Sequence, residues 1–457
     1  MSAPPPLRAG SVFYPGPKSM QYLLGSVNQP EASYTDHEKL IEEWLRQLKM
    51  WGKDSWKTLG LEKIVAFIGD QLTVSRLLGL FLRRFGDDNS FDRLDFLLPI
   101  FGWFHFVMAV ANSLHEQYLG RAKGEGLLAC FNLLNRKGLH KTSTEGPFHS
   151  HLNEALHHIA EAHFREIWSM LAGEEGLTVA GLRSKSPSEL VALSGRALHD
   201  YASSAALEQM RTKREADQDQ VQQLHTQFAR DILPYLSLVA AVKRGDVGML
   251  EALLPTFLFR FIGGGNTNYQ EMTLELLNGL NKDWPPNVAN FVRDNCWLLT
   301  FTGISYVSFD QAQEHNIKDI KVTYKPPGPR GGWDYMHTLH PAIPTIRENA
   351  EFIDQAFNTL TRGKKHTSPK KEGDIQKLLE RFKGVHGFAR SRKLSAEDKP
   401  EDYFEAGGEK WMGGSVRENW KDKRQFKRST EEKYVSRGEE SDVSDDSSSQ
   451  SEENIIS

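Results

Sequence analysis

The chain has 457 residues, of which 39% are hydrophobic and 10% aromatic, which is enough for a large folded core. Its formal net charge of −4 is small and does not indicate any particular partner. Only two cysteines occur, Cys130 and Cys296, which excludes a disulfide framework and a four-cysteine zinc site. Because the first ten residues, MSAPPPLRAG, lack a basic segment followed by an apolar one, we expect an intracellular protein of the nucleus or cytoplasm.

The first hundred residues predict two buried strands among helices. Residues 1–34 are rich in Pro, Gly and Ser and are typical of a flexible leader, and a helical period of apolar residues follows over 36–50. Residues 64–68 form a short apolar run that predicts a buried strand, and Thr73 is a candidate N-cap for a helix ending near residue 84. Residues 94–101 predict a second strand.

The stretch 96–114 contains no Asp, Glu, Lys or Arg and is about as long as a membrane span. Pro99, Gly102, His105 and Asn112 interrupt it, which favours a strand, a turn and a buried helix over a membrane span. We therefore expect no membrane partner.

A helical period dominates residues 148–357, with one long amphipathic helix over 221–242. The fold class that follows is α-rich α/β: one large, mostly helical domain over 35–360 around a small sheet. From residue 361 to 457 the charge runs predict a disordered tail, since residues 362–393 carry eleven Lys or Arg against three acidic residues, and a second basic cluster spans 421–428. The basic runs of the tail predict nucleic-acid binding. The competing interpretation is that the acidic end of the tail neutralises these basic runs.

Two candidate functional residues follow the predicted strands. Asp70 comes directly after the first strand, where open α/β sheets place metal and substrate ligands, although the alternative is a carboxylate that caps the next helix. His105 follows the second strand and is a candidate ligand or general base if the strands are parallel neighbours. Its alternative is a half-buried histidine satisfied by hydrogen bonds.

A later segment, VSFDQAQEHNIKDIK, adds Asp310 and Glu314, one helical turn apart. Two carboxylates in that relation are able to hold one divalent cation. The alternative, a surface ion pair between Glu314 and Lys318, is favoured by their spacing alone. Five histidines crowd 149–163, but no HExxH spacing occurs among them, so a solvated helix face is favoured over zinc there.

Three motifs in order, GDQLT, the FDRL…LPIFGWFHFVMAVANSLHEQY stretch and DQAQEHNIKDIK, make the chain resemble a family of uncharacterised fungal proteins. That family is common in mushroom-forming species and is defined by a domain of unknown function. The resemblance covers residues 22–357. It implies descent from a mobile element, because the motif order resembles that of transposases with an RNase H-like core.

In such a core, acidic residues on two strands and one helix hold two divalent metals for phosphodiester chemistry. The resemblance implies that Asp70 is the first acid and Glu314 the helical one, with Mg²⁺ or Mn²⁺ as the cofactor. Two features depart from the pattern: the second strand offers only His105 where an acid belongs, and a helix directly follows Asp70. Two hypotheses remain: an enzyme in which Asp70, Asp310 and Glu314 bind metal beside His105, or a non-catalytic helical interaction module in which these residues form a buried polar network.

Overall fold

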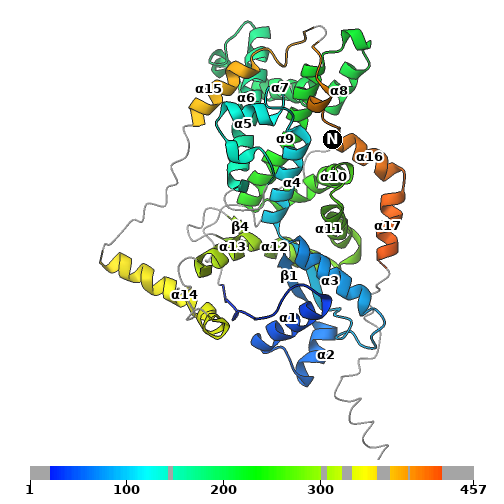
Figure 1. Ribbon diagram of the computed structural model, residues 1–457, viewed down its shortest axis with the longest axis vertical. Coiled ribbons are helices and arrows are strands. Elements are labelled where there is room, and N and C mark those ends of the chain that lie inside the picture. Colours follow the sequence, from blue (N-terminus) through cyan, green and yellow to red (C-terminus); the bar gives the residue numbers. More distant parts are fainter. Residues whose placement is uncertain are drawn as a thin grey trace, which may run out of the picture. The chain divides into compact units, whose positions relative to one another are not determined.

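The computed structural model of the protein describes residues 21–142, 148–299, 306–321, 332–357, 371–389 and 392–424 (Figure 1). It confirms a mostly helical fold with a small sheet. The chain divides into two compact units where we expected one domain over 35–360. We call them the sheet unit (residues 13–105, 271–363 and 415–457) and the helical unit (1–12, 106–270 and 364–414).

The sheet unit contains the four described strands and seven of the described helices. They are α1 (Tyr34–Gln47), α2 (Lys53–Glu62), β1 (Val65–Gly69), α3 (Gln71–Arg83), β2 (Leu97–Phe101), α12 (Pro286–Asn295), β3 (Trp297–Leu299), β4 (Tyr306–Ser308), α13 (Phe309–Asp319), α14 (Trp333–Ala356) and α17 (Ser415–Lys423).

The helical unit contains the helices α5 (Leu127–Leu133), α6 (Phe148–Glu174), α7 (Pro187–Tyr201), α8 (Ser204–Arg211), α9 (Gln220–Arg244), α10 (Val247–Gly263), α15 (Lys371–Phe382) and α16 (Tyr403–Met412). Of these, α6 has 27 residues and α9 has 25 residues. Helices α4 (Trp103–Tyr118) and α11 (Thr267–Asn278) run across the boundary between the units.

The two predicted strands form a parallel pair, in which Val65 lies opposite Leu97 and Gly69 opposite Phe101. Their carboxyl ends therefore meet at one edge. The short strands β3 and β4 pair antiparallel in a second sheet, with Trp297 opposite Ser308. Strands β3 and β4 lie within residues 148–357, over which we predicted a helical period.

In the sheet unit α1 packs on α3, and α3 packs on both β1 and β2. The apolar spacing buries leucine, isoleucine and phenylalanine side chains of α1 and α3, and aromatic rings from α2 and the connecting segments complete the cluster. Phe91 and Phe96 stack with ring centroids 5.4 Å apart. The shared core consists of Ile41, Leu45, Leu59, Leu77, Leu80, Phe81, Phe91, Phe96 and Leu97, with Trp51 and Trp56 against it.

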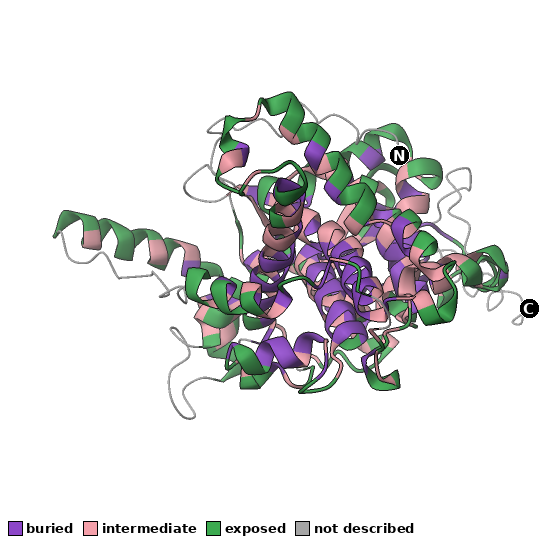
Figure 2. Ribbon diagram, turned by 90° about the horizontal axis from the view of Figure 1, so that it is seen from above, coloured by how far each residue is buried: buried purple, intermediate pink, exposed green. Residues whose placement is uncertain are grey.

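The long helix predicted over 221–242 is confirmed as α9. Its residues Ile232, Tyr235 and Leu238 are fully buried, as the three-to-four residue period predicts. Figure 2 shows where buried, intermediate and exposed residues lie; along α9 only Lys243 and Arg244 are exposed. No helix among the described residues has both the length and the apolar character needed to cross a membrane.

Helices α15 and α16 lie within the segment from residue 361 to 457 that we predicted as a disordered tail. Helix α15 buries Ile375, Leu378 and Phe382, each at most 1% exposed, and packs on α6. Helix α16 packs on α10. The physical reason is that apolar residues spaced by three and four lie among the basic residues and form a helix face that the charge count conceals. Residues 358–370, with most of the first basic cluster, and 425–457 lie outside the described residues.

The predicted leader is partly fixed to the fold. Within residues 21–33, the backbone N–H of Gly25 donates to Gln47 Oε1 at 2.8 Å, and Ser33 caps α1 in a capping box with Asp36. Residues 1–20 lie outside the described residues.

Candidate functional site

Two helices begin at the carboxyl edge of the β1–β2 sheet. Strand β1 ends at Gly69 and α3 begins at Gln71, while β2 ends at Phe101 and α4 begins at Trp103. The backbone N–H of Gly102 donates to the Gly69 carbonyl at 2.8 Å, which keeps the two strand ends together. The edge therefore gathers the positive N-terminal ends of two helices, which favour negative charge.

Asp70 is the N-cap of α3. Its Oδ1 accepts the backbone N–H of Thr73 at 2.9 Å. Our assignment of the cap to Thr73 is therefore wrong, because the helix begins three residues earlier, where Asp satisfies a free backbone N–H. The alternative that we gave for Asp70, a carboxylate that caps the next helix, is confirmed. The residue is exposed, and the cap uses only one of its two carboxylate oxygens.

Helix α4 begins after Gly102, which has no side chain to cap it, and Asp310 of α13 takes that place. Asp310 Oδ2 accepts the backbone N–H of His105 at 2.9 Å, across 205 residues of sequence. A Cβ on Gly102 would overlap the Asp310 carboxylate. The glycine therefore leaves room for a carboxylate from a distant helix.

The same carboxylate oxygen orients the His105 ring. His105 Nδ1 lies 3.0 Å from Asp310 Oδ2, and His105 Nε2 lies 3.9 Å from Glu314 Oε1. Asp310 is 5% exposed, whereas the Glu314 side chain is 47% exposed. We call Asp70, His105, Asp310 and Glu314 the edge cluster; its His105 has a buried carboxylate on one ring nitrogen and an exposed one near the other.

The cluster shifts the protonation of its buried pair. Burial lowers the pKa of His105, but the hydrogen bond and charge of Asp310, with smaller contributions from Asp70 and Glu314, outweigh it and raise the pKa overall. Burial raises the pKa of Asp310, and the bonds from His105 outweigh it and lower that pKa. The pair therefore favours an ionised Asp310 beside a His105 that holds a proton more readily than usual.

The structure thus brings three of the four predicted residues into one group and places Asp70 close enough to influence His105 electrostatically. Glu314 faces His105, and among the described residues it makes no ion pair with Lys318, the alternative we drew from spacing. What the sequence missed is the partnership of Asp310 with the start of α4. The only signal for it was Gly102, a glycine where a capping side chain belongs.

The residues fit a hard divalent cation in part. Asp70 and Glu314 offer exposed carboxylates, and Asp310 Oδ1 is buried beside Ser308, whose side chain contributes to the lowered pKa of Asp310. Mg²⁺ keeps several waters and needs only one or two carboxylates. The ligand atoms of the cluster are not drawn together, since only Glu154, His158 and Asp374 of the helical unit bring three such atoms within 4.8 Å among the described residues.

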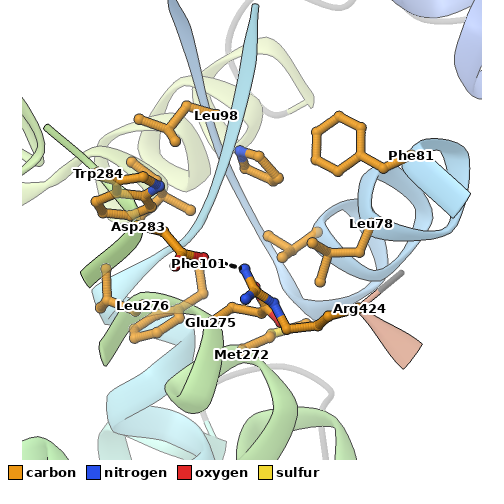
Figure 3. A pocket seen from close by; sticks show the side chains of 13 residues that line it. Leu78, Phe81, Leu98, Phe101, Met272, Glu275, Leu276, Asp283, Trp284 and Arg424 are labelled. Atoms are coloured by element: carbon orange, nitrogen blue, oxygen red, sulfur yellow. Dashed lines mark hydrogen bonds and ion pairs between the residues drawn. The ribbon is translucent and has the colours of Figure 1, made fainter. Parts of the chain in front are cut away.

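A separate cavity of about 240 Å³ lies beside β2 in the sheet unit (Figure 3). Its walls are mainly apolar, and the polar groups at one end bond to one another. Glu275 accepts from Trp420 Nε1 at 2.7 Å and from Arg424 Nε at 3.0 Å, and Arg424 also donates to Asp283 at 2.8 Å. Burial raises the pKa of Glu275 despite these donors. None of the edge-cluster residues lines this cavity, which is bounded by Val74, Leu78, Phe81, Leu98, Pro99, Ile100, Phe101, Met272, Glu275, Leu276, Asp283, Trp284 and Arg424.

The chain belongs to a family of unknown function designated DUF6589, whose model matches residues 4–366. That match covers both strands, the edge cluster and most of the helical unit. No curated protein and no solved structure matches the chain.

Proposed function

We propose that this protein is a fungal, mobile-element-derived, transposase-like protein whose edge cluster carries out metal-dependent phosphodiester chemistry. The observation that supports the proposal is the His105 ring, which Asp310 fixes through Nδ1 while Nε2 lies on the side of an exposed carboxylate. A histidine oriented in this way by a buried carboxylate is a common general base.

Each residue of the cluster has a role in the proposed reaction. Asp70, Glu314 and Oδ1 of Asp310 would hold Mg²⁺ or Mn²⁺, and the ion would neutralise charge at the phosphate. His105 Nε2 accepts a proton from an attacking water as the new P–O bond forms and the bond to the leaving oxygen breaks. Asp310 has two roles in this proposal: its Oδ2 positions His105, and its Oδ1 would contact the metal.

The substrate proposed for the site is nucleic acid, bound in the nucleus through basic segments near the C-terminus. Residues 362–371 and 421–428 are rich in Lys and Arg. Contacts of this kind release counterions, so binding should weaken steeply with salt. Trp420 and Arg424 are already engaged with Glu275, so they do not contribute to a free basic surface. The remaining basic residues of these segments carry the proposed affinity.

The test is cleavage of supercoiled DNA by the full chain in Mg²⁺ or Mn²⁺. The wild type should nick the DNA only with metal present, and His105→Gln should reduce the rate by roughly 100-fold or more, the usual contribution of a general base. His199→Gln is the matched control, because His199 is an exposed histidine of the helical unit. Equal cleavage by wild type and His105→Gln would refute the role of His105.

A second function, a non-catalytic helical interaction module, is favoured by one specific observation. Asp70 and Asp310 each accept a backbone N–H at the start of a helix, which is a complete structural role. Absence of metal-dependent cleavage in the wild type, with the fold intact, would support this module in place of the enzyme.

A further inference from the structure

Three buried histidines meet in the core of the helical unit. His163 lies on α6, His225 on α9 and His386 just after α15, and α6 packs against both α9 and α15. Each of the three residues is at most 2% exposed. Glu125, just before α5, approaches the group with its Oε2 3.8 Å from His225 Nε2. We call these four residues the histidine cluster.

The cluster leaves polar atoms unsatisfied. Among the described residues, His225 Nε2 and His386 Nδ1 are buried without a hydrogen-bond partner, since 3.8 Å is too long for a bond from His225 to Glu125. Buried polar groups are nearly always paired, so two such nitrogens in one cluster need an explanation. A cavity of about 20 Å³ lies beside Glu125, His163 and His225, which is room for one water or one ion.

The spacing of the rings matches a shared metal ion. With Zn–N bonds of about 2.0–2.1 Å and tetrahedral angles, two ligand nitrogens lie about 3.3 Å apart and their ring centroids about 5.2 Å apart. The observed centroid distances are 5.0 Å for His163 and His225, 5.2 Å for His163 and His386, and 5.9 Å for His225 and His386. His163 Nδ1 and His386 Nε2 are joined by a hydrogen bond of 3.0 Å, which a shared ion would replace.

We propose that His163, His225 and His386, with Glu125 as the fourth ligand, form a binding site for a divalent transition-metal ion of the zinc class. Imidazole ligands select such ions over Mg²⁺ or Ca²⁺, which prefer oxygen. The site joins α6, α9 and the segment after α15, so its role is to fasten that segment to the helical core. It is separate from the edge cluster and does not depend on the proposed function.

Binding requires a small local rearrangement. As the side chains stand, the ligand atoms do not all lie within 4.8 Å of one another. Rotation of an imidazole about its Cβ–Cγ bond moves a ring nitrogen by about 2 Å and leaves the ring centre in place, which is the movement that closes the site. Burial lowers the pKa of all three histidines, that of His386 to about 3, and so keeps them in the neutral form that binds metal.

One other group in the helical unit has metal-ligand chemistry but already holds a cation. Glu154, His158 and Asp374 converge, and Arg136 Nη2 lies 2.7 Å from Glu154 and 3.1 Å from Asp374. The guanidinium therefore occupies the position that an ion would take. In the histidine cluster, Arg381 pairs with the outer carboxylate, and its Nη2 lies 3.3 Å from Glu125 Oε2.

The test uses the full chain, stripped with a chelator and titrated with Zn²⁺. We expect one equivalent to bind and to raise the melting temperature, and a Co²⁺ derivative to show the visible absorption of a tetrahedral site. His225→Leu or His386→Leu should weaken Zn²⁺ binding by roughly 100-fold or more. His199→Leu, at an exposed histidine, should leave it unchanged.

The design separates binding from folding. Each variant is compared with its own metal-free form, so the increment in melting temperature on adding Zn²⁺ is measured even where the metal-free protein is less stable. His158→Leu tests the competing group. The proposal is overturned if wild type and His225→Leu show the same Zn²⁺ affinity and increment, or if His158→Leu abolishes binding while His225→Leu does not.

Discussion

Asp310 shows how one residue links structure and proposed chemistry. Its Oδ2 caps α4 through the His105 N–H and also orients the His105 ring. The sequence predicted that the two strand ends meet, because each apolar run ends at a polar residue. It therefore also predicted that Asp70 and His105 approach each other. The role of Asp310 did not, because a contact across 205 residues leaves no local pattern.

Among single-residue changes, Gly102→Ala should disturb the edge cluster. The new Cβ overlaps the Asp310 carboxylate, so either α13 or the start of α4 must move, at a cost of about 1–3 kcal/mol of unfolding free energy. Gly86→Ala is the control, since a Cβ there meets nothing within 4 Å. Denaturant unfolding of both variants measures the difference. Equal stability of the two would contradict the capping geometry.

Among the elements, the pairing of α16 with α10 depends on glycine. A Cβ on Gly407 would overlap the Phe259 carbonyl, and one on Gly263 would overlap the Tyr403 carbonyl, so the two backbones approach directly. We read this segment as a disordered tail because basic and acidic runs dominate its composition. Helix α16 packs through glycine, and such close backbone packing gives no hydrophobic period in the sequence. Helix α15 does have such a period, in Ile375, Leu378 and Phe382, but we gave more weight to the many charged residues around it.

The variants Gly407→Ala and Gly408→Ala test this contact on one helix. Gly407→Ala should lower the unfolding free energy by about 1–3 kcal/mol and expose α16 to protease. Gly408→Ala should be neutral or stabilising by up to about 1 kcal/mol, because its Cβ meets nothing within 4 Å and alanine favours helix. Identical protease sensitivity of the two variants would count against the packing.

The attachment of α16 should also weaken in acid. Burial raises the pKa of Asp402, but bonds from Arg230 at 2.7 and 3.0 Å and from Arg211 at 3.1 Å outweigh it and lower the pKa below its usual 3.8. The carboxylate therefore contributes stability that is present above pH 3.8 and is lost as the pH falls through the lowered pKa.

Unfolding measured between pH 6 and pH 2.5 checks this linkage. The wild type should lose more stability over that range than Asp402→Asn, which keeps the helix cap and removes the charge. Asp246→Asn is the control, since Asp246 caps α10. The same pH dependence in wild type and Asp402→Asn would show that the ion pair with Arg230 has no such role.

For the molecule as a whole, the C-terminal helices belong to the folded units. A chain ending at residue 361 loses α15 and α16 and uncovers the apolar residues that they bury, so it should aggregate or melt at lower temperature than the full chain. A chain ending at residue 424 keeps every described helix and should melt as the full chain does. Equal melting of the 361 truncation and the full chain would refute the packing of these helices.

The central claim is that the edge cluster binds a divalent metal, and Mn²⁺ calorimetry on the full chain tests it most directly. Asp70→Asn is the decisive variant, because asparagine caps a helix about as well as aspartate and lacks the charge that binds a cation. Asp54→Asn, in the first turn of α2, controls for removal of an acid elsewhere in the sheet unit. We predict that Mn²⁺ binding persists in wild type and Asp54→Asn and is weakened at least about tenfold in Asp70→Asn and Glu314→Gln. Unchanged Mn²⁺ affinity in Asp70→Asn and Glu314→Gln, or no Mn²⁺ binding by the wild type, would contradict the claim.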